Sequence, residues 1–404
     1  MANPTLDSLV KFAERNNRPA CVGFFYTGGT FACVDTPKGL RPLDNETDVA
    51  ELLDKGMNLG ALKQAHLLDY KLDFLFSIDS TNISAADRDR IVSAITPKFP
   101  FYDGTIVIHG TDTGAETAKH LHLALPFYNP STELDAGYNW TKPVILLSSQ
   151  LSGAARIAGT FAPSFGSDAQ TNLATALVTI ADQQIGESGI ITNGYQLLRG
   201  TAANKVTENE IPPFEHDKAV PALGTLTALG MRYNETSFLR ATTVGESNHI
   251  PLTITNAAFY EQLVLPITES TQLQPFYQII HPKTKEVKAF QEWVEQSLPK
   301  IVIYQTKGAG NIPDTDAKRL RELAEKGVNI FRTPIPGGRI PDRQLYDTAG
   351  GEYMGLNMQM HTAISKAMMC LSIVDKMRLP AEKTYDYVTK LMVKPWGNEF
   401  LPRR

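Results

Sequence analysis

The sequence predicts an α/β fold with two α/β domains, a larger N-terminal domain built on a parallel sheet and a smaller C-terminal one. A chain of 404 residues is long enough to bury two cores. Its first half alternates apolar strand-like runs with helix-like runs, the order that produces a parallel sheet covered by helices. Composition then loosens before a second alternating unit begins. We therefore expect domains at 1–215 and 261–404, joined by a linker region at 216–260.

Short apolar runs in the first half predict buried strands, and the segments between them have helical spacing. The expected strands are residues 19–27, 70–78, 104–110, 142–150 and 188–194. The expected helices are residues 83–95, 112–125 and 167–184. Ser84, followed three residues later by Asp87, is a weak capping-box signature at the start of the first of these helices. Leu6, Leu9 and Phe12 indicate one face of a short helix before the first strand.

The linker is placed where Pro, Thr and Asn occur among short β-like pieces, between residues 200 and 260. After it, strands are expected at 300–306 and 328–333, and helices at 314–327, 356–377 and 381–394. No internal repeat or low-complexity tract interrupts this pattern.

The composition is that of an ordinary globular chain, and it argues against several classes of function. Hydrophobic residues make up 42% and charged residues 20%, with a formal net charge of −4. No cluster of Lys and Arg is interleaved with aromatic residues, so nothing indicates nucleic-acid binding. The three cysteines, Cys21, Cys33 and Cys370, are odd in number, widely spread and without a CxxC spacing. That usage fits a reducing compartment.

The N-terminus has no apolar segment of signal-peptide length. No apolar run approaches the roughly 18 residues that a membrane span needs. We expect a soluble, cytoplasmic protein with no membrane partner.

Polar side chains follow the ends of neighbouring expected strands. Thr30 follows the first strand in the stretch FFYTGGTFA. Asp79 and Ser80 follow the second, and Thr111 and Asp112 follow the third. Ligands of open parallel sheets bind beyond the carboxyl ends of the strands, so these residues mark a candidate site. The fourth strand also ends in small polar residues, Ser-Ser-Gln.

These strand ends have both a structural and a chemical interpretation. Paired glycines mark turns because Gly reaches positive φ without steric cost, and Thr and Asp are favoured where helices begin. Alternatively, the glycines allow close approach to the backbone, and the open amides of the 112–125 helix stabilise an anion or a developing oxyanion. A threonine hydroxyl would then need a neighbouring base, and a lysine whose ammonium is disfavoured by burial can serve. Sequence spacing cannot choose that lysine.

Together these segments resemble the bacterial-type L-asparaginase family, most closely its cytoplasmic type I branch. The matching stretches are YTGGT (26–30), IDSTNIS (78–84), IVIHGTDTGAETA (106–118), KPVILLSSQ (142–150), SDAQTNL (167–173), LLRGTAANK (197–205) and KGAGNIP (307–313). They occur in the family's order with roughly its spacings, over nearly the whole chain and more loosely beyond residue 310. TGGT alone is a weak signal, but TGGT followed by HGTDT is a strong one.

The resemblance implies catalytic roles for four residues. In that family the second threonine of TGGT attacks the side-chain amide, which points to Thr30. The HGTD motif supplies Thr111 and Asp112, and the lysine after the Arg-Gly turn is Lys205. They would form a Thr–Lys–Asp relay in which the lysine is the base and the aspartate orients it. Either threonine could form the acyl-enzyme, and Thr30 is the preferred nucleophile.

The resemblance also implies how a substrate is held. Asp112 matches the residue that binds the α-ammonium group of the substrate. Ser80, with Asp79 and Thr81 on either side, matches the position that grips the α-carboxylate.

The implied reaction is hydrolysis of the side-chain amide of L-asparagine, or of L-glutamine, to the acid and ammonia through a threonine acyl-enzyme. No metal or organic cofactor is implied. His120 and His122 are two apart on an expected helix, so they face different ways and make a poor ligand pair. Family members form dimers or dimers of dimers, so the resemblance implies a homodimer or homotetramer acting on a free amino acid.

One position departs from the family. Members carry a tyrosine on the mobile loop after TGGT, with its hydroxyl against the nucleophile, and that position falls on Leu40 here. Leucine neither donates nor accepts a proton. Three alternatives follow: a slower enzyme that relies on Thr111 and Lys205, an amidase for a larger or partner-delivered substrate like the D subunit of the archaeal glutamyl-tRNA amidotransferase, or a catalytically weakened amino-acid-binding protein.

Two insertions exceed the type I pattern, at 126–141 and around 153–166. We expect each either to cover the site or to form an interface, and the residues do not decide between these roles.

Overall fold

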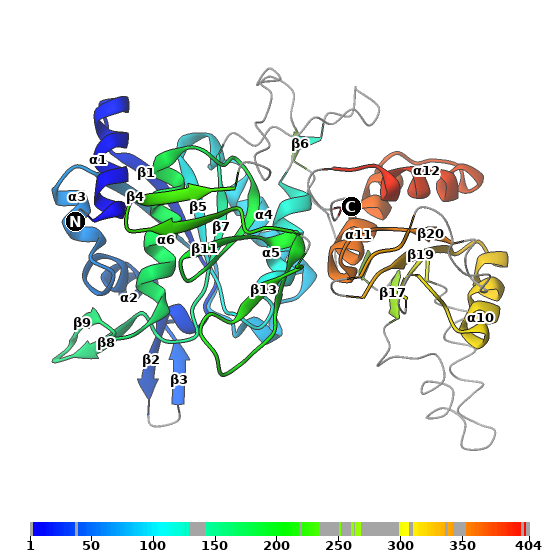
Figure 1. Ribbon diagram of the computed structural model, residues 1–404, viewed down its shortest axis with the longest axis horizontal. Helices are drawn as coiled ribbons and strands as arrows, with labels where there is room; N and C mark the ends of the chain where they lie inside the picture. The colour runs from blue at the N-terminus through cyan, green and yellow to red at the C-terminus, as the bar shows by residue number, and fades with distance from the viewer. Residues whose placement is uncertain are drawn as a thin grey trace. The chain divides into compact units, whose positions relative to one another are not determined.

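The computed structural model forms two compact units, Met1–Thr253 and Ile254–Arg404. The structure describes residues 3–36, 39–125, 127–128, 142–218, 220–234, 250–251, 260–261, 263–267, 299–306, 310–335, 338–341, 353–396 and 400. Both units combine helices with a sheet (Figure 1), mostly parallel in the first unit and parallel in the second, which confirms the predicted fold class.

The first unit is built on an eight-stranded sheet of order β15-β14-β11-β10-β7-β5-β1-β4. The parallel strands are β1 (Ala20–Tyr26), β4 (Leu68–Phe74), β5 (Gly104–Ile108), β7 (Val144–Leu147) and β10 (Ser188–Asn193). Each corresponds to one of the predicted strands. The antiparallel strands β11 (Gln196–Arg199), β14 (Gly224–Thr227) and β15 (Gly230–Tyr233) extend the sheet at one edge. The last two lie within the segment that was expected to be a linker.

Helices cover both faces of this sheet because its strands are apolar on both sides. The helices are α1 (Pro4–Asn16), α4 (Ala85–Ile95), α5 (Gly114–Ala124) and α6 (Asp168–Asp182). Helices α1 and α6 pack together (Figure 1) in a cluster with Ile145 and Leu147 of β7. Leu146, between those two residues, packs in a separate cluster with Ala115 and Ala118 of α5. The predicted helices are confirmed, as is the capping box of Ser84 and Asp87.

The strand order reverses at β1, which has β4 on one side and β5 on the other. Chain connections leave the sheet in opposite directions on the two sides of such a switch point, and this leaves a crevice at the carboxyl ends of the strands. The turns that follow β1, β4 and β5 therefore meet at the same edge of the sheet.

Several short elements have no counterpart among the predicted ones. They are α2 (Glu46–Glu51), the π-helical turn η2 (Leu52–Gly56), α3 (Leu59–Gln64), and the hairpins β2–β3 (Cys33–Thr36, Gly39–Pro42), β8–β9 (Ala154–Ile157, Thr160–Pro163) and β12–β13 (Ala203–Lys205, Phe214–His216). Hairpin β8–β9 occupies the predicted insertion at 153–166. Of the insertion at 126–141 the structure describes only 127–128, where β6 (Phe127–Tyr128) pairs with β16 (Ile250–Pro251), and the rest lies outside the described residues.

The second unit contains a parallel sheet of order β17-β18-β19-β20. Its strands are β17 (Val264–Ile267), β18 (Ile301–Gln305), β19 (Asn329–Thr333) and β20 (Met354–Gly355), and its helices are α10 (Asp314–Glu325), α11 (Met360–Lys376) and α12 (Ala381–Val393). Val302, Leu320 and Ile330 belong to its own hydrophobic core. The two strands and three helices predicted for this half are confirmed.

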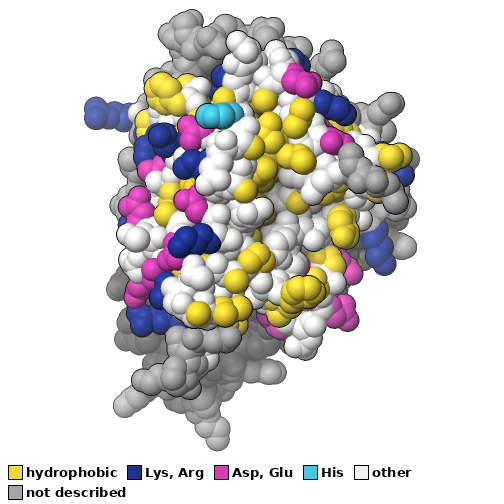
Figure 2. All heavy atoms as spheres, turned by 90° about the vertical axis from the view of Figure 1, so that its left-hand side faces the viewer, with side chains coloured by type: hydrophobic (Ala, Val, Ile, Leu, Met, Phe, Trp, Pro, Cys, Tyr) yellow, Lys and Arg dark blue, Asp and Glu magenta, His cyan; other side chains and the backbone are white. Residues whose placement is uncertain are grey.

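The face of the first unit that lies to the left in Figure 1 carries charges of both signs (Figure 2). Lys and Arg side chains alternate with Asp and Glu around a band of hydrophobic side chains. This face therefore offers no continuous basic strip of the kind that tracks a nucleic-acid backbone.

Candidate active site

The turn after β1 lies in direct backbone contact with the turns after β4 and β5. Gly28 and Gly29 have φ values of 110° and 94°, in the region that favours glycine. A Cβ on Gly28 would lie 2.5 Å from the carbonyl oxygen of Ile78, and one on Gly29 would lie 2.3 Å from the amide nitrogen of Gly110. A side chain fits at neither position. What approaches these glycines is the backbone of the protein itself.

Gly110 completes this contact between the three turns. A Cβ at Gly110 would lie 2.4 Å from Oγ of Ser80, which is almost completely buried. The hydroxyl of Thr113 donates to the backbone carbonyl of Ser80 at 2.7 Å. The three glycines thus bring the TGGT, IDST and HGTDT segments within van der Waals contact, as the strand order requires.

The two threonines of TGGT have different surroundings. Thr27 is fully buried, and its Oγ1 donates to the carbonyl of Ile108 at 2.8 Å. Thr30 begins the short 3-10 turn η1 (Thr30–Ala32) and is partly exposed. Its hydroxyl forms no hydrogen bond within the described part of the chain. Thr27 therefore holds the turn together, while the hydroxyl of Thr30 is available.

Thr111 lies in the turn before α5, which starts two residues later than predicted, at Gly114. Its Oγ1 donates to Oε1 of Gln150 at 3.1 Å, although only 5% of Thr111 is exposed. The amide of Gln150 in turn donates from Nε2 to the backbone carbonyl of Glu208 at 3.0 Å. The end of β7 and the loop after β12 are thereby joined at Thr111.

Asp112 is the centre of a second set of contacts. Its Oδ1 accepts a hydrogen bond from Nζ of Lys205 at 2.5 Å. Oγ1 of Thr81 lies 3.0 Å from Oδ2 of Asp112 and 2.8 Å from Oδ1 of Asp79, so one hydroxyl proton is shared between two carboxylates. Glu208 also accepts from Nζ of Lys205, with its Oε2 at 2.5 Å.

These contacts set the charges of the central ion pair. Burial alone would lower the pKa of Lys205, but its hydrogen bonds to Asp112 and Glu208 outweigh burial and raise that pKa. Burial alone would raise the pKa of Asp112, but the hydrogen bonds from Lys205 and Thr81 outweigh it, so the pKa lies below its ordinary value. Lys205 is thus an ammonium and Asp112 a carboxylate at neutral pH. The expectation of a lysine neutralised by burial is not met at Lys205, because two carboxylates compensate its desolvation.

A different lysine has the lowered pKa. Lys119 on α5 is fully buried, and burial lowers its pKa to about 8. Its Nζ donates to the carbonyl of Ala203 at 2.6 Å and to Oδ1 of Asn204 at 3.1 Å. Lys119 therefore fixes strand β12, and with it Lys205, against α5.

His109 supports the HGTDT turn from inside. It is fully buried, and burial lowers its pKa to about 4, so it is neutral. Nδ1 of His109 carries the ring proton, because its partner at 2.8 Å, the carbonyl of Gly110, can only accept. Nε2 of the neutral ring therefore accepts from the hydroxyl of Thr117 at 3.0 Å, and Oγ1 of Thr117 accepts from Nε of Arg88.

The structure thus joins most of the residues that the sequence singled out. Asp79, Thr81, Asp112 and Lys205 form one continuous chain of hydrogen bonds, and Ser80 contacts the HGTDT turn. Among the described contacts, however, Lys205 bonds neither Thr30 nor Thr111.

Sequence reasoning assigned no role to Gln150 or Glu208. Gln150 had a signal, since it closes the polar end of a predicted strand. Glu208 had none, because an acidic residue three positions after a lysine is common on any surface.

Leu40, at the position of the expected tyrosine, lies on the β2–β3 hairpin, where it is paired with Asp35 and 54% exposed. The chain at the start of this hairpin is hydrogen-bonded to the chain at the start of the insertion at 153–166. The amide of Gly153 donates to the carbonyl of Phe31 at 3.0 Å, and Oγ of Ser152 donates to the carbonyl of Cys33 at 2.6 Å.

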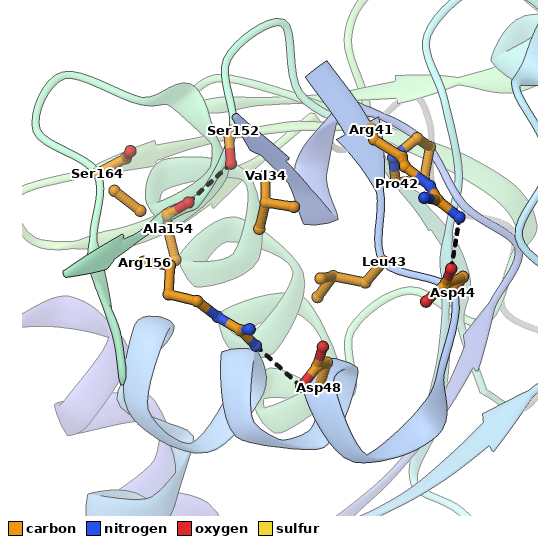
Figure 3. A pocket seen from close by; sticks show the side chains of 11 residues that line it. Val34, Arg41, Pro42, Leu43, Asp44, Asp48, Ser152, Ala154, Arg156 and Ser164 are labelled. Carbon is orange, nitrogen blue, oxygen red and sulfur yellow. Dashed lines mark hydrogen bonds and ion pairs between the residues drawn. The ribbon is translucent and has the colours of Figure 1, made fainter. Parts of the chain in front are cut away.

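A hollow of about 390 Å³ lies between the two hairpins (Figure 3). Val34 and Leu43 lie in its middle, and Arg156 extends across it to Asp48 at 2.9 Å. None of the predicted site residues lines this hollow. The insertion therefore braces the segment that follows Thr30.

The described residues hold no cluster of three or more His, Cys, Asp or Glu placed to bind a metal ion. His120 pairs with Asp89, and His122 contacts the backbone of Ser188, so the two point to different partners. Within the same residues, no helix combines the length and apolar character needed to cross a membrane.

Comparison with known proteins agrees with this arrangement. The family model described as "Asparaginase, N-terminal" matches residues 21–238, which is more than half of the chain and includes every residue of the contacts above. The chain belongs to the asparaginase family. Members of this family are amidohydrolases, and the protein is an enzyme of that class.

Individual asparaginases resemble the chain over most of its length. L-asparaginase 1 of Escherichia coli strain K12 is 25% identical over 322 residues, which cover 78% of this chain and 80% of that protein. The structure of L-asparaginase I from Vibrio cholerae matches with a TM-score of 0.66 and 21% identity, covering 95% of this chain and 99% of that one. The thermostable L-asparaginase from Thermococcus kodakarensis matches with a TM-score of 0.66 and 18% identity, covering 95% and 100%. At these identities the structural likeness establishes the asparaginase fold.

Proposed function

We propose that the protein hydrolyses the side-chain amide of L-asparagine to L-aspartate and ammonia, with L-glutamine as a further substrate. The observation that carries this proposal is the contact between the turns that follow β1, β4 and β5, which Gly28, Gly29 and Gly110 make possible. The turn that carries the available hydroxyl of Thr30 touches the segment that carries Thr111 and the Asp112–Lys205 ion pair, which supports Thr30 as the nucleophile.

In the proposed reaction Oγ1 of Thr30 attacks the amide carbon and transfers its proton through the Thr111–Lys205–Asp112 relay. The amide nitrogen takes up a proton and leaves as ammonia. Water then attacks the resulting acyl-threonine, which releases the carboxylate and restores the hydroxyl. Thr111 is buried and oriented by Gln150, which suits a residue that passes a proton on rather than one that is acylated.

The relay requires Lys205 without its extra proton. An ammonium has three N–H donors and no lone pair, whereas the neutral amine keeps two donors and gains an acceptor. The neutral form can therefore keep its bonds to Asp112 and Glu208 and still accept the proton of a threonine hydroxyl. Because the pKa of Lys205 is raised, the neutral form is scarce at neutral pH and becomes more populated as the pH rises. The rate should therefore increase with pH.

The substrate would be held by Asp112 and by the turn that carries Asp79, Ser80 and Thr81. Asp112, partly exposed and ionised, is suited to the α-ammonium group. Ser80 would bind the α-carboxylate, while Asp79 and Thr81 fix the turn that carries it.

Release of ammonia from asparagine and from glutamine is the direct test. We expect turnover of asparagine by the purified protein and none by Thr30→Ala. Absence of ammonia at millimolar substrate, from protein shown to be folded by circular dichroism, would refute the proposal.

Leu40 gives one specific reason to consider a second candidate, an amidase for a larger or partner-delivered substrate. An exposed leucine in place of the expected phenol supplies no proton-transfer group but does offer an apolar contact. Under the first proposal Leu40→Tyr should raise the rate with free asparagine. An unchanged rate, together with activity that appears only when a second subunit co-purifies, would favour the second candidate.

We also propose that the enzyme acts in the cytoplasm as a homodimer or homotetramer and uses no cofactor. The cytoplasmic location is supported by Cys21, Cys33 and Cys370, none of which is joined in a disulfide. Sedimentation measurements would test the assembly.

A further inference from the structure

Lys205 is held between two carboxylates rather than one. Oδ1 of Asp112 and Oε2 of Glu208 both lie 2.5 Å from its Nζ. The side chain of Lys205 is 9% exposed, whereas that of Glu208 is 72% exposed. One carboxylate therefore belongs to the HGTDT turn, and the other reaches the same ammonium from the solvent side.

The approach of Glu208 is fixed by its backbone. The carbonyl of Glu208 accepts from Nε2 of Gln150, whose Oε1 accepts from Thr111. The amide of Val206 donates to the carbonyl of Pro213 at 3.0 Å, which continues the β12–β13 pairing beyond Lys205. Only the side chain of Glu208 is free to turn away from the ammonium.

We propose that Glu208 is a positioning residue that holds Lys205 in its ammonium form and so restrains turnover near neutral pH. This inference rests on the proposed function, in which neutral Lys205 is the base. An opposite charge in hydrogen-bond contact favours the charged form of a group, so each carboxylate opposes the loss of the lysine proton. Asp112 is also the expected partner of the substrate ammonium, whereas Glu208 is not. Glu208 therefore acts on the base without a share in substrate binding.

Other titratable groups lie on the segments next to Lys205 without bonding it, within the residues that the structure describes. They are Asp79, bonded to Thr81; His109, neutral and buried; Lys119, bonded to the backbone and side chain of β12; and Glu215, opposite Asn204 on β13. Removing the charge of Glu208 therefore leaves Asp112 as the one bonded carboxylate.

The variant Glu208→Gln tests this directly, because glutamine keeps the length of the side chain and an oxygen that can accept from Nζ. The matched control is Glu210→Gln, which removes the same charge from an exposed residue that forms no ion pair within the described chain. The readout is the pH at which Lys205 becomes half reactive toward acetic anhydride, measured by mass spectrometry of its peptide. Ammonia release from asparagine is followed over the same pH range.

We expect Glu208→Gln to lower the labelling midpoint of Lys205 by about one pH unit, with no shift in Glu210→Gln. Its turnover at neutral pH should rise by about three- to tenfold, and the rates should converge above the midpoint. Equal midpoints in all three proteins, or equal shifts in both variants, would overturn the proposal. So would a lowered midpoint with no gain in rate.

Labelling reports on Lys205 whether or not the protein acts on asparagine. If the labelling midpoint shifts only in Glu208→Gln and none of the proteins releases ammonia, Glu208 does stabilise the ammonium form of Lys205. That result would refute only the proposed function.

Discussion

Two threonines that stand three residues apart in the same motif have different tasks. The hydroxyl of Thr27 donates a hydrogen bond to the carbonyl of Ile108 and so joins the ends of β1 and β5. The hydroxyl of Thr30 has no such bond among the described residues, and Thr30 is partly exposed at the start of η1. At the scale of the residue, a partner for the hydroxyl separates a structural threonine from a candidate nucleophile.

This difference predicts opposite effects for two small substitutions. Thr30→Ala should lower the turnover of asparagine by about a thousandfold or more, because it removes the proposed attacking atom. The unfolding free energy should stay nearly unchanged, because the substitution removes no hydrogen bond of the described chain. Thr27→Val should lower the unfolding free energy by about 1 kcal/mol and keep the activity of the folded fraction, because it removes one buried hydrogen bond. Urea titrations and ammonia assays on both variants provide the check. Full activity in Thr30→Ala would remove its assigned role.

At the scale of elements, the site depends on how closely three turns approach one another. The glycine at each contact is required by neighbouring backbone or by Ser80, as the distances at Gly29 and Gly110 demonstrate. The next layer is formed by α5, which fixes β12 through Lys119 and the HGTDT turn through His109 and Thr117. One helix therefore positions both members of the Asp112–Lys205 pair.

Gly29→Ala should be much more damaging than an equivalent change at a glycine of similar φ in open space. Gly159, in the turn of the β8–β9 hairpin, has φ of 85° and no atom within 4 Å of an added Cβ. Gly159→Ala should cost about 1 kcal/mol for its backbone conformation alone. Gly29→Ala should cost several kcal/mol and abolish activity, since its Cβ would overlap the backbone of Gly110. Equal losses in thermal melts of the two variants would contradict the close contact.

Lys119 should make the free energy of unfolding increase with pH in the alkaline range. Its pKa lies at about 8 in the folded protein against an ordinary 10.5. Between these two values Lys119 is protonated in the unfolded chain and neutral in the folded protein, so the free energy of unfolding rises with pH. Below pH 8 the folded protein carries the buried charge, and its full cost applies. The gain is up to about 3 kcal/mol. The wild type should gain this stability relative to Lys119→Met in urea unfolding from pH 8 to 10.5. Lys218→Met, at an exposed lysine, should leave the pH dependence unchanged.

At the scale of the whole molecule, sheet order gives these contacts their place. The reversal at β1 sets the carboxyl ends of β4, β1 and β5 side by side, and the polar strand ends meet there although they are far apart in sequence. The second unit has a parallel sheet and a core of its own, and its predicted helices and strands formed where their patterns indicated.

Acid stability of the first unit should be limited by His109. Its pKa of about 4 lies below the ordinary 6.5. Between pH 4 and pH 6.5 His109 is therefore protonated in the unfolded chain but neutral in the folded protein. Stability should therefore fall as the pH drops from 6.5 to 4, by up to about 3 kcal/mol. His109→Gln should flatten this slope in urea unfolding, and His216→Gln, at a partly exposed histidine, should not. An unchanged slope in His109→Gln would show that another group governs acid unfolding.

The sequence alone determined the features that local pattern encodes. Apolar runs of strand length gave β1, β5 and β10, helical spacing gave α4 and α6, and the order of motifs identified Thr30, Thr111, Asp112 and Lys205 as candidates. Short hairpins such as β2–β3 and β8–β9 were missed because their strands are only four residues long and partly exposed, which leaves no apolar period to detect. Strands β14 and β15 are equally short; they lie among the β-like pieces between residues 200 and 260 that were assigned to the linker.

Only the tertiary structure decided which groups touch. The second carboxylate on Lys205, the tie from Gln150 to Thr111 and the buried lysine behind β12 join residues from separate strands, turns and loops. It also decided the charge of Lys205, which sequence reasoning expected to be neutral, since a pKa depends on what surrounds a group in space. A hydrogen bond or a Coulomb interaction acts over a few ångströms, and that separation is fixed by the folding of the chain rather than by distance along it.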